Sequence, residues 1–433
     1  MKTRCIVIGI CMLVGAGKAA ASNELNGLFD ARSTGMGGTG VAFLDSAGAI
    51  PTNPALLEQI DTFTLTANAF LISSQPERPY PIYHLDASGR RYRTYETIRS
   101  DVEAPAVLPF LGGAFRILDR VVVGAALYPV IGQGTHATYR PAPDEFPDLE
   151  ITNDAGLGFF EGSVPVSVRI LDNLSLGLSW RVTYMTQFVE TVQPGGPPAG
   201  VLLDVNNQPL APEIKVTGWN FSGLQAGVLY APIPDLRLGL SYRSKVTVDG
   251  EGTTTVADLN TGLPMELPTR QSFTNPHAFR IGLAASLLEG KLLLTQDFKY
   301  LMYAESWETL ETTTVRNGVE SVNVRELNWT DAFNIHLGVE YNVSDVVSLR
   351  GGYILATTAT PEAFAQAFMA PPGLSHLGSV GLGIHAMETL SLDAAFAYVA
   401  VSSRVYEATP ENAGAGYYAS YAAQLALSAT YHN

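Results

Sequence analysis

The stretch LSLGLSWRVTY, residues 174–184, alternates between apolar side chains and polar or small ones. A period of two is typical of a β-strand whose two faces meet different surroundings. In a soluble sandwich the apolar face packs in a core. In a membrane barrel the apolar face meets lipid, and the polar face, here with Arg181, lines a wet lumen. This stretch fits both folds, and the rest of the chain decides between them.

The same alternation recurs over residues 236–248, 333–341 and 421–431. Many of these strands exceed ten residues, aromatic side chains lie near their ends, and basic side chains interrupt their polar faces. These three features favour a membrane barrel over a soluble sandwich. Across residues 236–248 the parity predicts Val246 and Val248 on the apolar face, and Lys245 on the polar face.

Short and long connections alternate along the chain. Six very short turns lie at 118–120, 171–173, 233–235, 288–290, 342–345 and 386–388. Seven long polar segments lie at 76–103, 134–153, 192–214, 250–271, 305–327, 360–375 and 402–416. Outer-membrane barrels have short turns on one side, long loops on the other and an even strand number. We therefore predict an all-β fold, a 14-stranded antiparallel transmembrane β-barrel over residues 61–433 with both ends on the short-turn side.

The first 21 residues have the features of a secretory signal peptide. Basic residues precede an apolar run of 12 residues, 6–17, and three alanines, 19–21, offer a cleavage site. The run is too short to span a bilayer as a helix, and no later run of 18 apolar residues exists. Both cysteines, Cys5 and Cys11, fall within the signal, so we expect a mature chain without disulfides or thiolate metal ligands.

The charged residues and histidines argue against several functions. The predicted signal contains three of the 26 basic residues and none of the 41 acidic ones, which leaves a mature charge of −18 and disfavours nucleic acid as a partner. The seven histidines are scattered without metal-ligand spacing, so we expect no metal and no cofactor. An outer-membrane lipase would need a serine, a histidine and an acid at one rim. No such set stands out, and we do not expect an enzyme.

Residues 22–60 lack the period of two and are rich in glycine and alanine. They contain GMGGTG, residues 35–40, which matches the dinucleotide fingerprint G-x-G-x-x-G. That motif binds nucleotides between a buried strand and a helix, whereas the preceding ELNGLFDARST is not a buried strand. Because a barrel of this size has a wide lumen, we interpret the tract as a plug whose glycine-rich backbone packs tightly inside.

The stretch DARSTGMGGTGVAFLDSAGAIPTNPALL, residues 30–57, resembles the N-terminal hatch of the outer-membrane long-chain fatty-acid transporter family (FadL-like). That family includes uptake channels for toluene and other aromatic hydrocarbons. Blocks at 238–252, 329–353 and 376–399 extend the resemblance over nearly the whole mature chain. It implies a 14-stranded barrel with a hatch over residues 22–60, in agreement with the turn count. The matching hatch residues are Gly35, Gly37, Gly38, Gly40, Asn53, Pro54 and Ala55.

The resemblance also implies a transport mechanism. External loops capture a hydrophobic substrate and pass it to a pocket above the hatch, and the substrate leaves sideways through a kink in the third strand. That strand reads VVVGAALYPVIGQG, residues 121–134, in which Pro129, Gly132 and Gly134 suit a kink. Alternatively, Pro129 merely ends the strand. A lateral exit spares an apolar solute about 0.8 kcal/mol of rehydration per CH₂.

Two groups of residues are candidates for binding the substrate. The apolar candidates are Leu28, Phe29, Phe159 and Phe160. The basic candidates, which point inward by parity, are Arg181, Arg243 and Lys245. The basic side chains either meet a carboxylate headgroup or pair with carboxylates of the hatch and wall.

We expect a monomeric uptake channel for hydrophobic small molecules in the outer membrane, surrounded by lipid and lipopolysaccharide. Long-chain fatty acids or related lipophilic compounds are the first candidates for the cargo. A toluene-type aromatic hydrocarbon channel is one alternative, and a structural or secretion-partner barrel without a ligand is another. The choice among fatty acid, alkane and aromatic stays open, because the external loops that set it show no family pattern.

Overall fold

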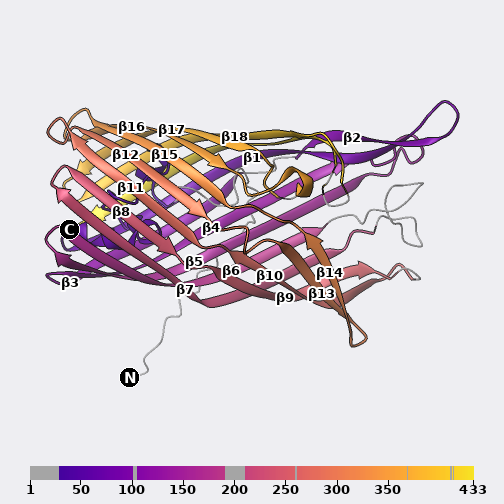
Figure 1. Ribbon diagram of the computed structural model, residues 1–433, viewed down its shortest axis with the longest axis horizontal. Helices are drawn as coiled ribbons and strands as arrows, with labels where there is room; N and C mark the ends of the chain where they lie inside the picture. The colour runs from indigo at the N-terminus through magenta and orange to yellow at the C-terminus, as the bar shows by residue number, and fades with distance from the viewer. Residues whose placement is uncertain are drawn as a thin grey trace, which may run out of the picture.

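The computed structural model describes residues 29–433 except 101–104, 191–209, 259–260, 368, 410–411 and 413, so the predicted signal peptide lies outside the described residues. In the described chain, fourteen antiparallel strands form a wall that closes where β1 pairs with β19 (Figure 1). The predicted barrel is confirmed. Its wall strands are β1 (Phe63–Leu85), β3 (Ala106–Leu118), β4 (Val121–Tyr139), β5 (Ile151–Leu171), β6 (Leu174–Glu190), β7 (Glu213–Ile233), β8 (Leu236–Arg243), β11 (Ala278–Leu287), β12 (Leu292–Leu301), β15 (Ala332–Asn342), β16 (Val347–Thr357), β17 (Leu374–Met387), β18 (Leu390–Val405) and β19 (Gly416–His432).

The connections alternate as the sequence predicts. Short turns follow β3, β5, β7, β11, β15 and β17, and they gather at the barrel end where the C-terminus lies (Figure 1). The predicted loops 76–103, 250–271 and 305–327 are partly strand, because hairpins continue the wall at the opposite end. These additional strands are β2 (Arg91–Arg99), β9 (Val246–Ala257), β10 (Pro264–Asn275), β13 (Thr309–Arg316) and β14 (Val319–Glu326).

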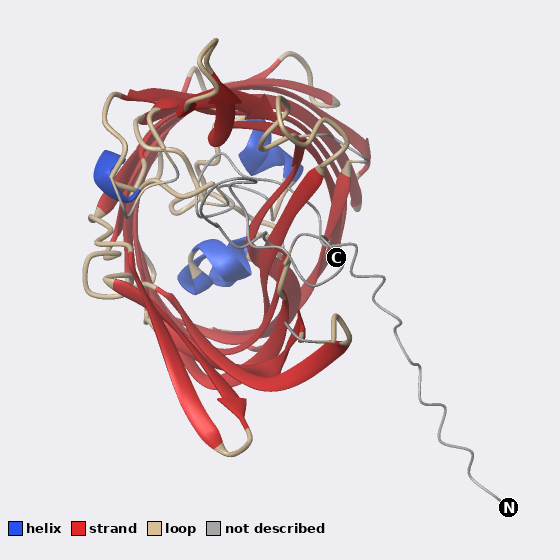
Figure 2. Ribbon diagram, turned by 90° about the vertical axis from the view of Figure 1, so that its right-hand side faces the viewer, coloured by secondary structure: helices blue, strands red, loops and turns tan. Residues whose placement is uncertain are grey.

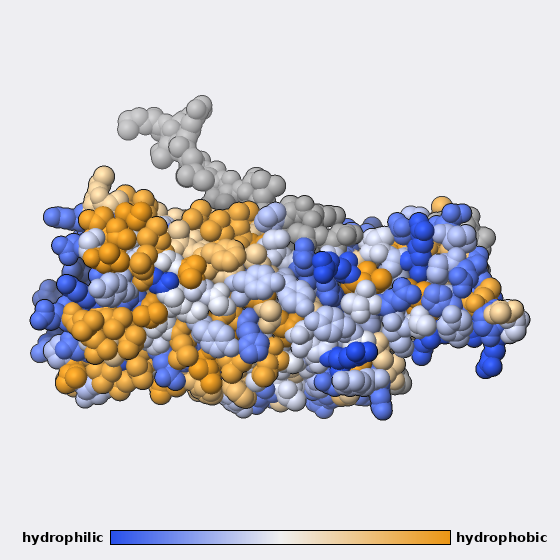
Figure 3. Space-filling view, turned by 90° about the horizontal axis from the view of Figure 1, so that it is seen from above, coloured by the Kyte–Doolittle hydropathy of each residue, from blue (hydrophilic) through white to orange (hydrophobic). Residues whose placement is uncertain are grey.

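The apolar face of the wall points outward. On β6, Leu178 and Trp180 are 58% and 48% exposed, whereas Ser179 and Arg181 between and beside them are buried. On the face that Figure 3 shows, hydrophobic side chains gather over the half of the barrel nearer the turns, and hydrophilic ones gather toward the hairpins. An apolar exterior around a polar interior is the arrangement of a membrane barrel and the inverse of a soluble sandwich.

The predicted parity fails at one place, between β8 and β9. Val246 and Val248 are buried inside the barrel and Lys245 is exposed, contrary to the prediction that the valines share the outward face. The backbone N–H of Ser244 donates to the Leu224 carbonyl, whereas the N–H of Lys245 donates to His277 Nδ1. Because residues 244–245 leave the regular ladder, the inward and outward positions exchange by one residue.

Residues 29–60, hereafter the inner segment, lie within the ring of strands, as the view along the barrel shows (Figure 2). The segment contains α1 (Ala31–Gly35), α2 (Ala49–Thr52) and the 3-10 helix η1 (Pro54–Gln59), and a second 3-10 helix, η2 (Glu362–Phe364), follows β16. Helix α1 packs against β16–β19, and η1 packs against β4–β7. Residues 22–28 of the predicted hatch lie outside the described residues. Within the described chain, no helix is long and apolar enough to cross a membrane.

A belt of wall glycines adjoins the inner segment. A methyl group on Gly352 would overlap the backbone nitrogen of Gly37, and one on Gly239 would overlap the carbonyl of Val41. Because a glycine has no Cβ, two backbones can pack in direct contact at these positions. The glycine belt, with one member on each of β6, β7, β8, β11, β15, β16 and β17, comprises Gly177, Gly227, Gly239, Gly282, Gly338, Gly352 and Gly381.

The glycine belt predicts a strong effect of adding a single methyl group. We expect Gly352→Ala to displace Gly37 from the wall and to destabilise the folded barrel by about 3 kcal/mol, because overpacking against rigid backbone leaves no side chain to move. The measurement is urea unfolding of the barrel folded in lipid vesicles.

The matched control is Gly378→Ala on β17, where a methyl group meets nothing within 4 Å. Equal midpoints for the two variants would show that the close approach at Gly352 is unimportant for stability.

Candidate functional site

The barrel wall is interrupted between β3 and β4. These strands pair from the turn up to Leu111 and Leu127, where their pairing ends. Beyond that point β3 still pairs with β1 through Ala106, and β4 still pairs with β5 to Tyr139. Farther along β4, the hydroxyl of Thr135 lies 2.8 Å from that of Ser100, the residue that follows β2. We call this opening in the hydrogen-bond ladder the β3–β4 gap.

Prolines flank the β3–β4 gap on both strands. Pro109 lies on β3 and Pro129 on β4, and the register of β4 against β5 shifts between Pro129 and Ile131. A proline has no N–H to give to the ladder, and a bulge bends the strand that carries it. Strand β4 continues through Gly132 and Gly134 to Tyr139, so the alternative that Pro129 ends the strand is wrong.

Aromatic side chains surround the inner side of the gap. Tyr128 packs edge-on against Phe29 with 5.2 Å between ring centroids, and its ring stacks on Phe110 at 6.3 Å. On β5, the buried Phe159 is opposite Ile131 in the register, and the half-buried Phe160 is opposite Pro129. Two of the predicted apolar candidates, Phe29 and Phe159, therefore lie on the inner side, whereas Phe160 lies on the opposite face of β5 from Phe159. The fourth, Leu28, lies outside the described residues.

A buried carboxylate holds two of the basic candidates. Glu161 accepts hydrogen bonds at 2.6 Å from both Arg181 and Arg243. Its second oxygen also accepts from the Tyr128 hydroxyl at 3.1 Å, which links the ion cluster to the gap. The wall thus supplies a carboxylate for Arg181, whereas Lys245 is exposed and stays outside the cluster. Sequence reasoning missed Glu161, although its inward parity on β5 was a usable signal.

The glycine turn of the inner segment is bound to the wall on both sides. Gly37 and Gly38 have φ values of 67° and 69°, which residues other than glycine rarely adopt. Asp297 on β12 accepts from the backbone N–H groups of Gly40 and Val41, at 2.9 and 3.1 Å. His336 on β15 contacts the Gly37 carbonyl at 2.8 Å. The spacing G-x-G-x-x-G therefore belongs to a turn that is hydrogen-bonded to side chains of the wall.

The NPA stretch of the inner segment has a separate anchoring role. Asn53 donates to the carbonyls of Val41 and Val228, at 2.8 and 3.0 Å, and its own side-chain oxygen accepts from the N–H of Ala55. Asn53 is thus the N-cap of η1 and joins that helix to β7. Pro54 occupies the first turn of η1, where a missing N–H costs nothing.

An ion-pair network fixes the other end of the inner segment. Arg32 binds Glu340 on β15 at 2.7 Å, and Glu340 in turn accepts from Arg350 on β16 at 2.6 Å. Arg350 also binds Asp393 on β18. Burial raises the pKa of the nearby Asp30 carboxyl, and the Asp393 carboxylate raises this pKa further. Charges inside the barrel are therefore engaged with one another across the boundary between segment and wall.

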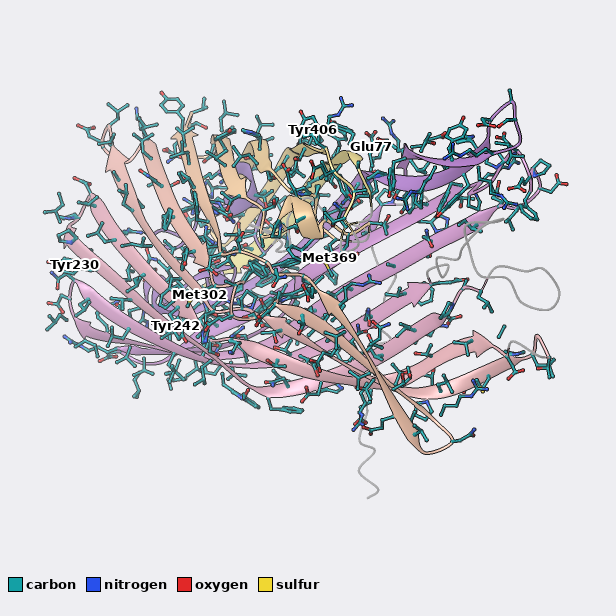
Figure 4. The ribbon with its side chains drawn as sticks, turned by 45° about the vertical axis from the view of Figure 1, so that its right-hand side comes forward. Glu77, Tyr230, Tyr242, Met302, Met369 and Tyr406 are labelled. Atoms are coloured by element: carbon teal, nitrogen blue, oxygen red, sulfur yellow. The ribbon has the colours of Figure 1, made fainter. Side chains whose placement is uncertain are left out.

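A small apolar cavity lies farther toward the hairpins. Its lining includes Leu157, Phe273, Trp307 and Met369, and its volume is about 20 Å³. Trp307 stacks on Trp329 with 4.3 Å between ring centroids. Pockets that bind small molecules enclose roughly 300–1,000 Å³, so side chains must move before a ligand enters. Met369, labelled in Figure 4, belongs to the connection that follows β16.

No group of three or more His, Cys, Asp or Glu side chains in the described parts of the chain could hold a metal ion.

A family of membrane transporters matches almost the whole chain. The model for "Outer membrane protein transport protein (OMPP1/FadL/TodX)" covers residues 13–433. The chain belongs to this family. The apolar exterior and the closed barrel of 14 strands agree with its outer-membrane location.

Known relatives and solved structures support the assignment. Outer membrane protein P1 of Haemophilus influenzae is 24% identical over 91% of this chain and 89% of its own length. The long-chain fatty acid transport protein of Escherichia coli is 27% identical over 49% of this chain and 47% of its own length. A FadL homologue from Pseudomonas aeruginosa has a TM-score of 0.72 at 19% identity, with 96% of this chain and 99% of that chain covered. The toluene transporter TodX of P. putida has the same TM-score at 17% identity, with 94% and 99% covered. These structures share the fold.

The buried carboxylate at the gap predicts a large effect on stability. We expect Glu161→Gln to destabilise the folded barrel by about 3–5 kcal/mol, because it leaves Arg181 buried without its carboxylate partner. Urea unfolding in lipid vesicles measures this change.

The control is Glu320→Gln, which breaks the exposed pair with Arg270 and should cost less than about 1 kcal/mol. A small change for both variants would contradict the importance of the Glu161 cluster.

Proposed function

We propose that the chain takes up hydrophobic small molecules through the outer membrane and releases them sideways through the β3–β4 gap. Family membership supports transport of hydrophobic compounds. The observation that carries the route is the loss of pairing beyond Leu111 and Leu127, next to aromatic side chains of β4 and β5. Long-chain fatty acids or related lipophilic compounds are the proposed cargo, and aromatic hydrocarbons are the alternative, since relatives with both names match.

The inner segment acts as the hatch in this proposal. Its helices fill the ring of strands, and its backbone contacts the glycine belt and the wall carboxylates. A solute that enters from the hairpin end therefore meets a closed path along the barrel axis. A lateral exit instead leads from an aromatic lining directly into lipid, which spares about 0.8 kcal/mol per CH₂ compared with passage through water. The route needs one copy of the chain, and we expect a monomer.

A structural or secretion-partner barrel is the competing proposal. It requires no ligand in the lumen and gives no function to an interruption of the wall. In a membrane wall, an interrupted ladder leaves backbone N–H and C=O groups that need other partners. The structural proposal gives no reason for this cost, so the β3–β4 gap favours transport.

Changing the residues at the gap tests the route. We expect Pro129→Val, Gly132→Val and Gly134→Val together to lower uptake of radiolabelled oleate or toluene by about tenfold or more, because a regular β4 can pair with β3 and closes the exit. Uptake is measured in cells that lack other channels of this family, and resistance to SDS confirms that the variant is folded.

The control is Pro268→Val on the exposed part of β10, which should transport normally. Unchanged uptake in the triple variant would contradict the lateral route. Absence of uptake of both compounds by the unaltered, folded chain would favour the structural alternative.

A further inference from the structure

Arg78 is a buried arginine whose partners are neutral. Its side chain points inward from β1 and is 2% exposed. One terminal nitrogen donates to the carbonyls of Glu77 and Ala419, and the other donates to the carbonyl of Met369 at 2.8 Å. The Nε–H of Arg78 has no hydrogen-bond partner. A guanidinium with five donors is thus bound only by carbonyl oxygens in a buried site.

No carboxylate in the described chain pairs with Arg78. The nearest in sequence is Glu77, which points to the other face of β1 and binds Arg99 at 2.6 Å. Its other ionisable neighbours are the hydroxyls of Tyr80 and Tyr418. Two other arginines buried inside the barrel behave differently, since Arg181 and Arg350 each bind a wall carboxylate. A buried cation without an anion is costly, and an anion that reaches it is correspondingly favoured.

The contact between Arg78 and Met369 lies beside the apolar cavity. Met369 belongs to residues 358–373, the connection between β16 and β17, and its side chain helps to line that cavity. At its base this connection is held by the hydrogen bond from the Thr358 N–H to the Gly373 carbonyl. Arg78 binds the connection at Met369, and both Met369 and the next residue, Ala370, are buried. Met369, which lines the cavity, is therefore held in place through its carbonyl by Arg78.

We propose that Arg78 is the binding site for the carboxylate headgroup of an entering amphipathic ligand, and that this carboxylate displaces the Met369 carbonyl and releases Met369 from the cavity. The inference rests on the proposed uptake function. A carboxylate offers two charged acceptor oxygens where Met369 offers one neutral oxygen, so the exchange favours the anion. A neutral ligand of equal length has no such advantage. The ligand's own charge therefore opens the cavity that receives its chain.

Paired probes of equal chain length test the headgroup site. We compare uptake of oleate and oleyl alcohol, below saturation, by cells that carry the unaltered chain or its variants. Arg78→Met should lower oleate uptake by about tenfold or more and leave oleyl alcohol uptake within about twofold, because charge-assisted hydrogen bonds are lost for the anion alone. Arg78→Lys should retain most of the oleate uptake, because it keeps the charge.

The control is Arg99→Met, which removes an exposed arginine from the same hairpin and should transport both probes normally. If Arg78→Met lowers both probes equally, or neither, the inference is wrong while the uptake function stands. If the unaltered, folded chain takes up neither probe, the proposed function fails, and the next experiment decides the inference without transport.

A single cysteine reports the release of Met369 directly. The chain has cysteines only at 5 and 11, in the predicted signal, so Ala370→Cys gives a unique thiol at a buried position in the mature chain. In phosphatidylcholine nanodiscs, oleate should speed maleimide labelling of this thiol by about fivefold or more, and oleyl alcohol should not. With Arg78→Met the thiol should react quickly even without oleate.

Two results of the labelling experiment would overturn the inference. One is a labelling rate that oleate leaves unchanged. The other is a rise produced by phosphatidylglycerol in the nanodisc without oleate, which would assign the site to a lipid phosphate.

Discussion

The backbone of the inner segment comes into direct contact with the barrel wall where the wall presents backbone without side chains. The wall strands already use their N–H and C=O groups in the ladder, so the segment is held by packing and by inward side chains. The glycine belt brings the two backbones into contact at positions such as Gly239 and Gly352. At that distance Asp297 reaches the amides of Gly40 and Val41, and Arg32 reaches Glu340. The hydrogen bonds of Asp297 and the ion pair of Arg32 therefore depend on the close approach at the glycine belt.

At the β3–β4 gap, in contrast, the wall lacks continuous backbone pairing. In a bilayer every backbone polar group needs a partner, so a membrane barrel is normally closed by continuous pairing. Prolines on both strands remove donors that would otherwise be left unpaired. Aromatic rings then occupy the inner side, and the Tyr128 hydroxyl connects them to Glu161 and its arginines. The interruption therefore has an apolar lining on its inner side and the Glu161 ion cluster next to that lining.

Local patterns in the sequence were enough to predict the barrel and its strand number. Both depend on residues close together in the chain, through alternation within a strand and short turns between strands. The exchange of faces at Ser244 and Lys245 was missed, because a single irregular residue leaves no mark in composition. Glu161, Pro109 and Arg78 were missed for another reason. Their importance depends on which strand pairs with which, and on partners that are distant in sequence.

The contacts of α1 have a consequence for biogenesis. This helix lies near the beginning of the chain, yet it packs against β16–β19, which are synthesised last. Helix α1 can therefore dock only after the final strands have been synthesised and β1 has paired with β19. Such contacts between the extremes of a chain form late, because the entropy of closing a long loop must be met first. A barrel interrupted before its last strands would lack the surface that holds α1, so docking of this helix requires β16–β19.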